Sequence, residues 1–214
     1  MTGRRLLVVN ADDFGFTRDV NEGILEAHLR GIVTATTLMA TGPAFAHAVE
    51  LARRHPTLDV GCHLVLIGGS SALPPFRPLP ASPGELAWRV MAGRIDVAAE
   101  LRAQARKVVA AGLQPTHLDT HKHSHMLPQV ASAVAAVSRE LGIPWVRRPL
   151  ELPVAGTLVA SIYRRGGCRM TDRFEGYRLT GRLDVASLTS LVAALRPGVT
   201  ELMCHPGCFG DELR

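Results

Sequence analysis

The sequence predicts one α/β domain with the architecture of a distorted or incomplete (β/α) TIM-like barrel, with its site at the C-terminal ends of the strands. Apolar runs of strand length alternate with segments of helical periodicity, and parallel strands require such crossovers. Four of these runs also carry Asp or His at their C-terminal ends, where a barrel of parallel strands holds its catalytic groups. The four runs cover residues 6–11, 58–64, 116–119 and 199–204.

The predicted elements follow one another in a regular order. Residues 18–30 carry apolar side chains at helical spacing and are closed by Gly31, and residues 33–40 form a second strand rich in Thr and Val. The helix predicted at 129–141 is opened by Pro128 and closed by Gly142. The remaining predictions are helices at 44–54 and 98–111 and a strand at 143–146.

Length and composition narrow the class of protein. At 214 residues and 47% hydrophobic content the chain can bury one sizeable core, but it is shorter than the roughly 250 residues usual for an eight-fold barrel. No apolar run approaches the roughly 20 residues of a membrane span, so we expect a soluble cytoplasmic protein. The oligomeric state stays open, a homo-oligomer included.

The excess of basic over acidic residues has two interpretations. Lys and Arg number 24 against 19 acidic residues, which suits a substrate carrying phosphate or carboxylate, or reflects the base content of the genome. No basic stripe with interleaved aromatic residues occurs, and nucleic-acid binding is therefore excluded. The four cysteines show no paired spacing and are expected in the core rather than as metal ligands.

Two irregular segments follow predicted strands. Residues 68–84 contain five prolines and follow the strand that carries His63, so we expect a rim loop that covers substrate, with a flexible linker as the alternative. Residues 147–181 show little periodicity and could supply recognition loops.

The densest chemical signal is the segment 116–125, which holds four histidines and Asp119. Imidazole and carboxylate are ligands that zinc and other divalent transition ions prefer, so this segment indicates a metal site. The alternative interpretation is a histidine-rich surface turn. A strand from His117 to His125 would span roughly 26 Å at about 3.3 Å per residue, so the chain must turn after Asp119. After that turn, His121 and His125 could share one helical face, which makes His121 a second ligand or a neighbour of the ligands. Asp119 is expected to orient a ligand histidine through its far ring nitrogen, while His117 and the remaining His123 are expected to make structural hydrogen bonds.

Four motifs together resemble those of one known family. They are Asn10-Ala11-Asp12-Asp13-Phe14-Gly15, Gly61-Cys62-His63-Leu64, the segment 116–125, and Glu201-Leu202-Met203-Cys204-His205-Pro206-Gly207. In this order they resemble the YdjC-like carbohydrate deacetylases, which include chitooligosaccharide deacetylases and deacetylases of hopanoid biosynthesis. The resemblance implies a distorted barrel, one divalent metal ion such as zinc or magnesium, and hydrolytic removal of an N-acetyl group from an amino sugar of an oligosaccharide or glycolipid. Family members continue past the last motif, so the single domain 1–214 is expected to lack the family's C-terminal end.

The same resemblance implies roles for individual residues. Asp13, His63 and His125 match the metal ligands. Side chains alternate along a strand, so Asp12 and Asp13 must point apart; the resemblance favours Asp12 as the general base, and the reverse assignment stays open. His205 ends the last predicted strand and suits the general acid for the departing amine, with a turn cap as the alternative.

The sequence leaves open which molecule carries the acetamido sugar, and it leaves open two rival functions. Residues 145–153 and 172–176 favour the hopanoid-type members of the family. A metal-dependent phosphoesterase or other amidohydrolase on a similar barrel would also gather Asp and His at strand ends, usually with ligands for two metals. A non-catalytic sugar- or metal-binding module is the third reading.

Overall fold

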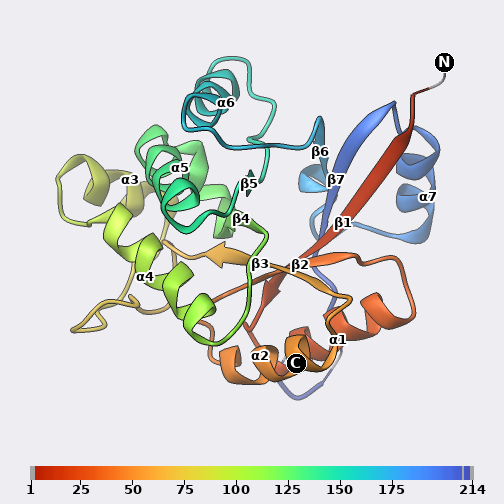
Figure 1. Ribbon diagram of the computed structural model, residues 1–214, viewed down its shortest axis with the longest axis horizontal. Helices are drawn as coiled ribbons and strands as arrows, with labels where there is room; N and C mark the ends of the chain where they lie inside the picture. Colours follow the sequence, from red (N-terminus) through yellow and green to blue (C-terminus); the bar gives the residue numbers. More distant parts are fainter. Residues whose placement is uncertain (1–2, 209, 213–214) are drawn as a thin grey trace.

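The computed structural model describes residues 3–208 and 210–212 and contains one curled sheet of seven parallel strands (Figure 1). The order across the sheet is β5-β4-β3-β2-β1-β7-β6, and every neighbouring pair is parallel. The predicted incomplete barrel is confirmed. The strands are β1 (Arg5–Phe14), β2 (Ala35–Leu38), β3 (Asp59–Leu64), β4 (His117–Thr120), β5 (Trp145–Val146), β6 (Arg173–Glu175) and β7 (Gly198–Cys204).

Strands from the two ends of the sequence meet in the middle of the sheet. Seven residues of β1 pair in register with β7, from Arg5 opposite Gly198 to Ala11 opposite Cys204. Figure 1 shows these two strands, red and blue, side by side. The paired aspartates that follow Ala11 are thereby brought next to the His205 turn that follows Cys204.

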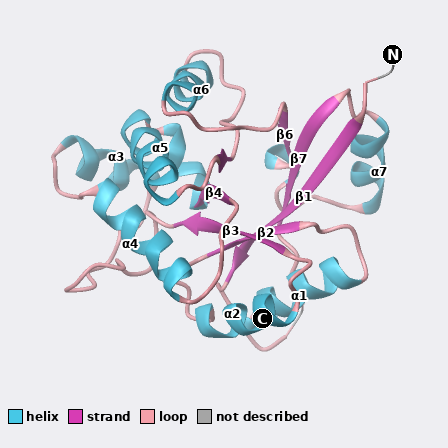
Figure 2. Cartoon of the chain, viewed as in Figure 1, coloured by secondary structure: helices cyan, strands magenta, loops and turns pink. Residues whose placement is uncertain are grey.

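Helices cover the outer face of the sheet (Figure 2). Apolar side chains such as Ile24, Leu101 and Val130 are fully buried there against strand residues such as Val9 and Ala11. The helices are α1 (Arg18–Leu29), α2 (Phe45–Arg54), α3 (Pro83–Met91), α4 (Val97–Ala110), α5 (Pro128–Leu141), α6 (Ala155–Arg165) and α7 (Val185–Ala193), with 3-10 turns η1 (His121–Met126) and η2 (Tyr177–Leu179). No helix among the described residues has both the length and the apolar character that crossing a membrane requires.

The concave face of the sheet is polar. Because side chains alternate along a strand, Asn10 and Asp12 point away from the helix side, on which Val9 and Ala11 are packed. Asn10 on β1 reaches His117 on β4 although β2 and β3 lie between these strands, so both side chains extend into the barrel interior.

The β5 edge of the sheet is capped by a residue from outside the named strands. The N–H of Val146 donates to the carbonyl of Arg169 at 2.9 Å, and the N–H of Arg169 donates to the carbonyl of Pro144 at 2.7 Å. The chain then continues into β6, which forms the opposite edge. The segment that follows α6 thus spans the opening of the incomplete barrel.

Two expectations about irregular segments need correction. Residues 147–181 contain α6, β6 and η2 rather than loops alone, and the prediction also missed α3 and α7. Residues 68–84 are not a loose linker, because Ser70 and Pro78 form an antiparallel bridge and buried Glu100 binds the loop through Ser71 and the N–H of Ala72. Whether this loop contacts substrate stays a prediction.

Candidate metal centre and catalytic site

The end of β1 turns its two aspartates in different directions. Asp13 has a left-handed backbone, with φ of 67°, and the pairing with β2 shifts between Ala11 and Phe14. Such an irregularity re-aims a side chain at the end of a strand. Asp12 is therefore buried in the barrel interior, while the side chain of Asp13 retains 21% exposure at the rim.

Asp13 forms a tight triangle with two histidines from separate elements. Its Oδ1 lies 3.2 Å from Nε2 of His63 on β3 and 3.0 Å from Nδ1 of His121 in η1, and these two nitrogens are 3.2 Å apart. Ligand atoms about 2.1 Å from a metal ion and at right angles around it are separated by about 3.0 Å. The three atoms therefore fit three ligand positions of one divalent cation.

The ring of His63 is oriented for this purpose by Asp119. Nδ1 of His63 donates to Oδ1 of Asp119 at 2.6 Å, which directs Nε2 towards Asp13 and His121. A carboxylate behind a ligand histidine fixes the tautomer and increases its basicity as a ligand. Burial lowers the pKa of His63, but the charge and hydrogen bond of Asp119 outweigh it and the net pKa is raised.

The Asp13 carboxylate is kept ionised by the same neighbours. Burial raises its pKa, but hydrogen bonds from His121 and His63 and the charges of both rings leave the net pKa well below the usual range. An ionised carboxylate and two imidazoles form a donor set that suits zinc or another first-row divalent ion.

His125 lies outside this triangle. Its Nδ1 contacts Oγ1 of Thr120 at 2.7 Å, its ring lies near those of His123 and Tyr163, and its Nε2 is buried without a hydrogen-bond partner. The shared helical face predicted for His121 and His125 does not form, because Lys122 and His123 between them have left-handed backbones. The structure therefore brings His121, rather than His125, next to Asp13 and His63.

Arg147 is a site residue that the sequence analysis missed. The residue follows β5 and is 3% exposed, and its guanidinium makes a bidentate contact with Asp12, with both N–O distances 2.6 Å. It also lies 2.7 Å from Asp119 and 2.7 Å from Glu201. The only sequence signal was a polar residue directly after a predicted strand.

Arg147 also contacts two members of a second group of possible cation ligands. One ligand atom each of Asp12, His63 and Asp119 lie within 4.8 Å of one another, which could be read as a second metal group. The guanidinium lies 2.6 Å from Asp12 and 2.7 Å from Asp119, and its positive charge disfavours a second cation there. Among the described residues, Asp13, His63 and His121 therefore form the better candidate cation site.

Asp12 has one acceptor position left. A carboxylate has about four lone-pair positions, and Arg147 takes one on each oxygen while the side-chain amide of Asn10 donates to Oδ1 at 2.9 Å. The position that remains is on Oδ2, the oxygen that lies 4.0 Å from Nε2 of His205.

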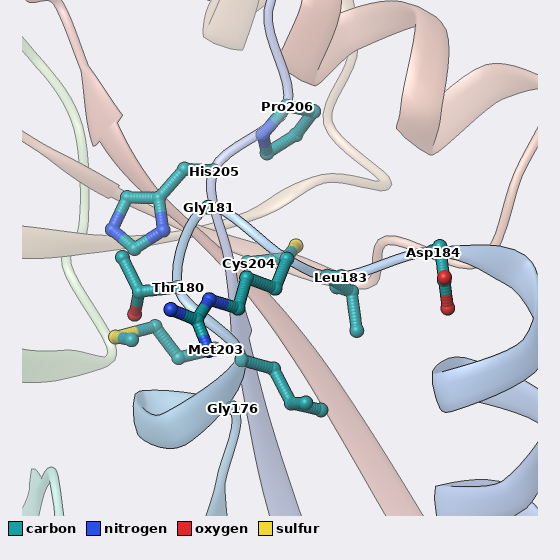
Figure 3. A pocket seen from close by; sticks show the side chains of 11 residues that line it. Gly176, Thr180, Gly181, Leu183, Asp184, Met203, Cys204, His205 and Pro206 are labelled. Carbon is teal, nitrogen blue, oxygen red and sulfur yellow. The ribbon is translucent and has the colours of Figure 1, made fainter.

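His205 borders an open cavity of about 640 Å³ (Figure 3). The side chain of His205 is 36% exposed, and Figure 3 shows it together with Thr180 and Met203, with Leu183 and Asp184 on the opposite side. His205 thus lies beside both the cavity and the buried Asp12, which is 4.0 Å from its Nε2.

Fold and site together define a (β/α)-barrel protein with a candidate cation site at the C-terminal ends of its strands. Residues 6–214 match the family model described as YdjC-like protein, and the chain belongs to this family.

Named relatives cover nearly the whole chain. It is 45% identical to a "Carbohydrate deacetylase" of Brevibacillus brevis, over 97% of this chain and 83% of the relative, and 37% identical to a "Chitooligosaccharide deacetylase" of Yersinia enterocolitica, over 98% and 84%. A solved structure from Enterococcus faecalis, described as a "putative cellobiose-phosphate cleavage protein", is 26% identical and superimposes with a TM-score of 0.78, over 98% of this chain and 84% of that one.

Proposed function

We propose that this chain is a metal-dependent hydrolase that removes the N-acetyl group from an amino sugar, with an N-acetylated oligosaccharide as its substrate. The observation that carries the proposal is the pairing of a three-ligand cation site with a separate, oriented carboxylate, Asp12. The enzyme class is supported by the deacetylase names of relatives that are 36–45% identical over almost the whole chain.

Asp13, His63 and His121 would hold the divalent ion. A bound ion would act as a Lewis acid towards the acetamido carbonyl and the attacking water. This ligand set replaces the one with His125, because the three ligand atoms lie 3.0–3.2 Å apart whereas the ring of His125 is turned towards Thr120 and Tyr163.

Asp12 would take the proton of the attacking water. Its free acceptor position on Oδ2 is held in one direction by Arg147 and Asn10, and general bases require such fixed geometry. His205 would then give a proton to the departing amine, since its Nε2 lies 4.0 Å from Asp12 and its ring borders the cavity of about 640 Å³ that can receive the sugar.

The test measures bound metal and acetate release on two aspartate variants. Wild-type protein loaded with zinc or magnesium is assayed on N-acetylated chitooligosaccharides, with N-acetylated glycolipids and phosphate monoesters as comparison substrates. Asp12→Asn should lower turnover by about 10²- to 10⁴-fold with metal content unchanged, because the amide cannot accept the proton. Asp13→Asn should lose metal, because a neutral oxygen replaces an anionic ligand.

Several outcomes would contradict the proposal. Phosphate release without acetate release would favour a phosphoesterase. Unchanged acetate release by both variants would exclude the mechanism, and metal loss in Asp12→Asn alone would exchange the roles of the two aspartates.

A further inference from the structure

A polar chain crosses the barrel interior beneath the Asp12 carboxylate. Nδ2 of Asn10 lies 2.9 Å from Oδ1 of Asp12, and Oδ1 of Asn10 lies 2.9 Å from Nε2 of His117. Nδ1 of His117 lies 2.8 Å from Oγ1 of Thr116. These hydrogen bonds therefore join the second half of β1 to the start of β4, with β2 and β3 between the two strands in the sheet.

The hydrogen bonds that join Asp12, Asn10 and His117 can run in only one direction. An ionised carboxylate only accepts, so Asn10 must turn its amide N–H towards Asp12 and its carbonyl oxygen towards His117. Nε2 of His117 must then carry a hydrogen, while the single hydrogen of the Thr116 hydroxyl can be donated either to Oδ1 of Asp59 at 2.8 Å or to Nδ1 of His117. His117 thus selects the amide orientation that Asp12 needs.

The space for the His117 ring is reserved by Gly61 on β3. A Cβ atom at Gly61 would lie 2.6 Å from both Nε2 and Cδ2 of His117, closer than real Cβ contacts. Asn10 is only 1% exposed, and Nε2 of His117 is the hydrogen-bond donor 2.9 Å from its carbonyl oxygen. Leaving a buried acceptor unpaired is costly, and the Asn10 amide would have to shift.

We propose that His117 is a positioning residue for deacetylation: it fixes the Asn10 amide, which in turn holds the Asp12 carboxylate with its free Oδ2 position directed at the reaction. This inference rests on the proposed function. It assigns His117 no contact with the substrate and no contact with the cation.

The experiment compares His117→Ala, His117→Gln and His28→Ala. His28 is a matched control because its two ring nitrogens are also hydrogen-bonded, to the carbonyl of Val33 and to Thr57, but on α1 outside the barrel interior. For each variant kcat, KM, metal content and melting temperature are measured. Thr116→Val serves as a milder variant if His117→Ala does not fold.

His117→Ala should lower kcat by about 10- to 100-fold, with KM and metal content unchanged, because a small misplacement of a reacting group is sufficient for such a loss. His117→Gln offers an N–H donor and should recover most of the activity, and His28→Ala should behave as wild type.

Unchanged kcat in His117→Ala, together with an active wild type, would overturn the positioning role alone. An equal loss of kcat in His28→Ala would mean that the effect of His117→Ala reflects general stability and not positioning, and this would also overturn the proposal. A wild type that releases no acetate would overturn the proposed function instead, and the nitrogen NMR signals of His117 would then decide the hydrogen-bond order: an Nε2 without hydrogen contradicts it.

Discussion

Arg147 carries its charge into the interior of the barrel, where Asp12, Asp119 and Glu201 surround it at 2.6–2.7 Å. Removing a charge from water is expensive, and the cost is offset only where several oriented partners satisfy it. Burial raises the pKa of Asp119, but the Arg147 and His63 charges outweigh it, so the net pKa lies below the usual range. Asp119 can therefore serve both residues as an anion, His63 through Oδ1 and Arg147 through Oδ2.

His125 gives a prediction on pH. Burial, with smaller contributions from the charges of His123 and Arg147, lowers its pKa to about 3. The unfolded chain takes up this proton near pH 6.5, so stability is complete above that pH and decreases as pH falls towards 3, by up to about 1.4 kcal/mol per pH unit. Urea unfolding of metal-free protein between pH 7 and 5 should show a smaller decrease for His125→Phe. An identical decrease in both proteins would contradict the prediction.

The sequence predicted well that Asp and His side chains meet at the site. It predicted less well which histidine of the segment 116–125 lies next to Asp13 and His63. The paired aspartates and His63 end strands, and strand ends can be located from apolar runs. The choice between His121 and His125 depends on two consecutive left-handed residues, Lys122 and His123, which neither residue type favours. Arg147 was missed because nothing in the sequence distinguishes a buried arginine from the many exposed ones.

At the scale of elements, sequence periodicity predicted the long amphipathic helices well. The helix predicted at 18–30 is Arg18–Leu29 and that at 129–141 is Pro128–Leu141. The missed helices α3 and α7 have nine residues each, which gives little length for an apolar pattern to repeat, and α7 packs against the core through the partly buried Leu188 and Leu191.

The contact between α1 and the turn after His205 gives a second prediction. A Cβ at Gly23 on α1 would overlap the backbone of Gly207. Gly23→Ala should therefore displace the turn that carries His205 and lower kcat by about 10-fold or more, although Ala is the better helix former. Gly84→Ala in α3 is the control, because its Cβ would meet only Oγ of Ser82 at 4.0 Å. Equal kcat values for the two variants would show that the turn tolerates the displacement.

The anchoring of the 68–84 loop gives a third prediction. Glu100 on α4 binds the Ser71 hydroxyl and the N–H of Ala72, and it also accepts from Gln104 at 2.7 Å. Glu100→Ala should free this loop and speed chymotryptic cleavage after Phe76, which is 61% exposed, whereas Glu100→Gln keeps an acceptor and should be cleaved more slowly. Mass spectrometry of the first fragments measures this, and equal cleavage rates would mean that the loop is held elsewhere.

At the scale of the whole molecule, the proposed cation site joins β1, β3 and the turn after β4. An ion that binds only the folded chain stabilises it, by about 2.7 kcal/mol at a concentration 100 times the dissociation constant. Zinc or magnesium should therefore raise the melting temperature of the wild type and of His125→Ala, but not of His121→Ala. The opposite result for the two histidine variants would restore His125 as the ligand.

The capped edge of the sheet has a consequence for the behaviour of the protein at high concentration. An open barrel has two edge strands, and unpaired backbone groups on an edge invite strands of other molecules. Here the edges are only two and three residues long, and Arg169 occupies the outer side of β5. An incomplete barrel can thus avoid intermolecular strand addition without closing, and Arg169→Pro, which removes the N–H that bonds to Pro144, would expose the chain to it.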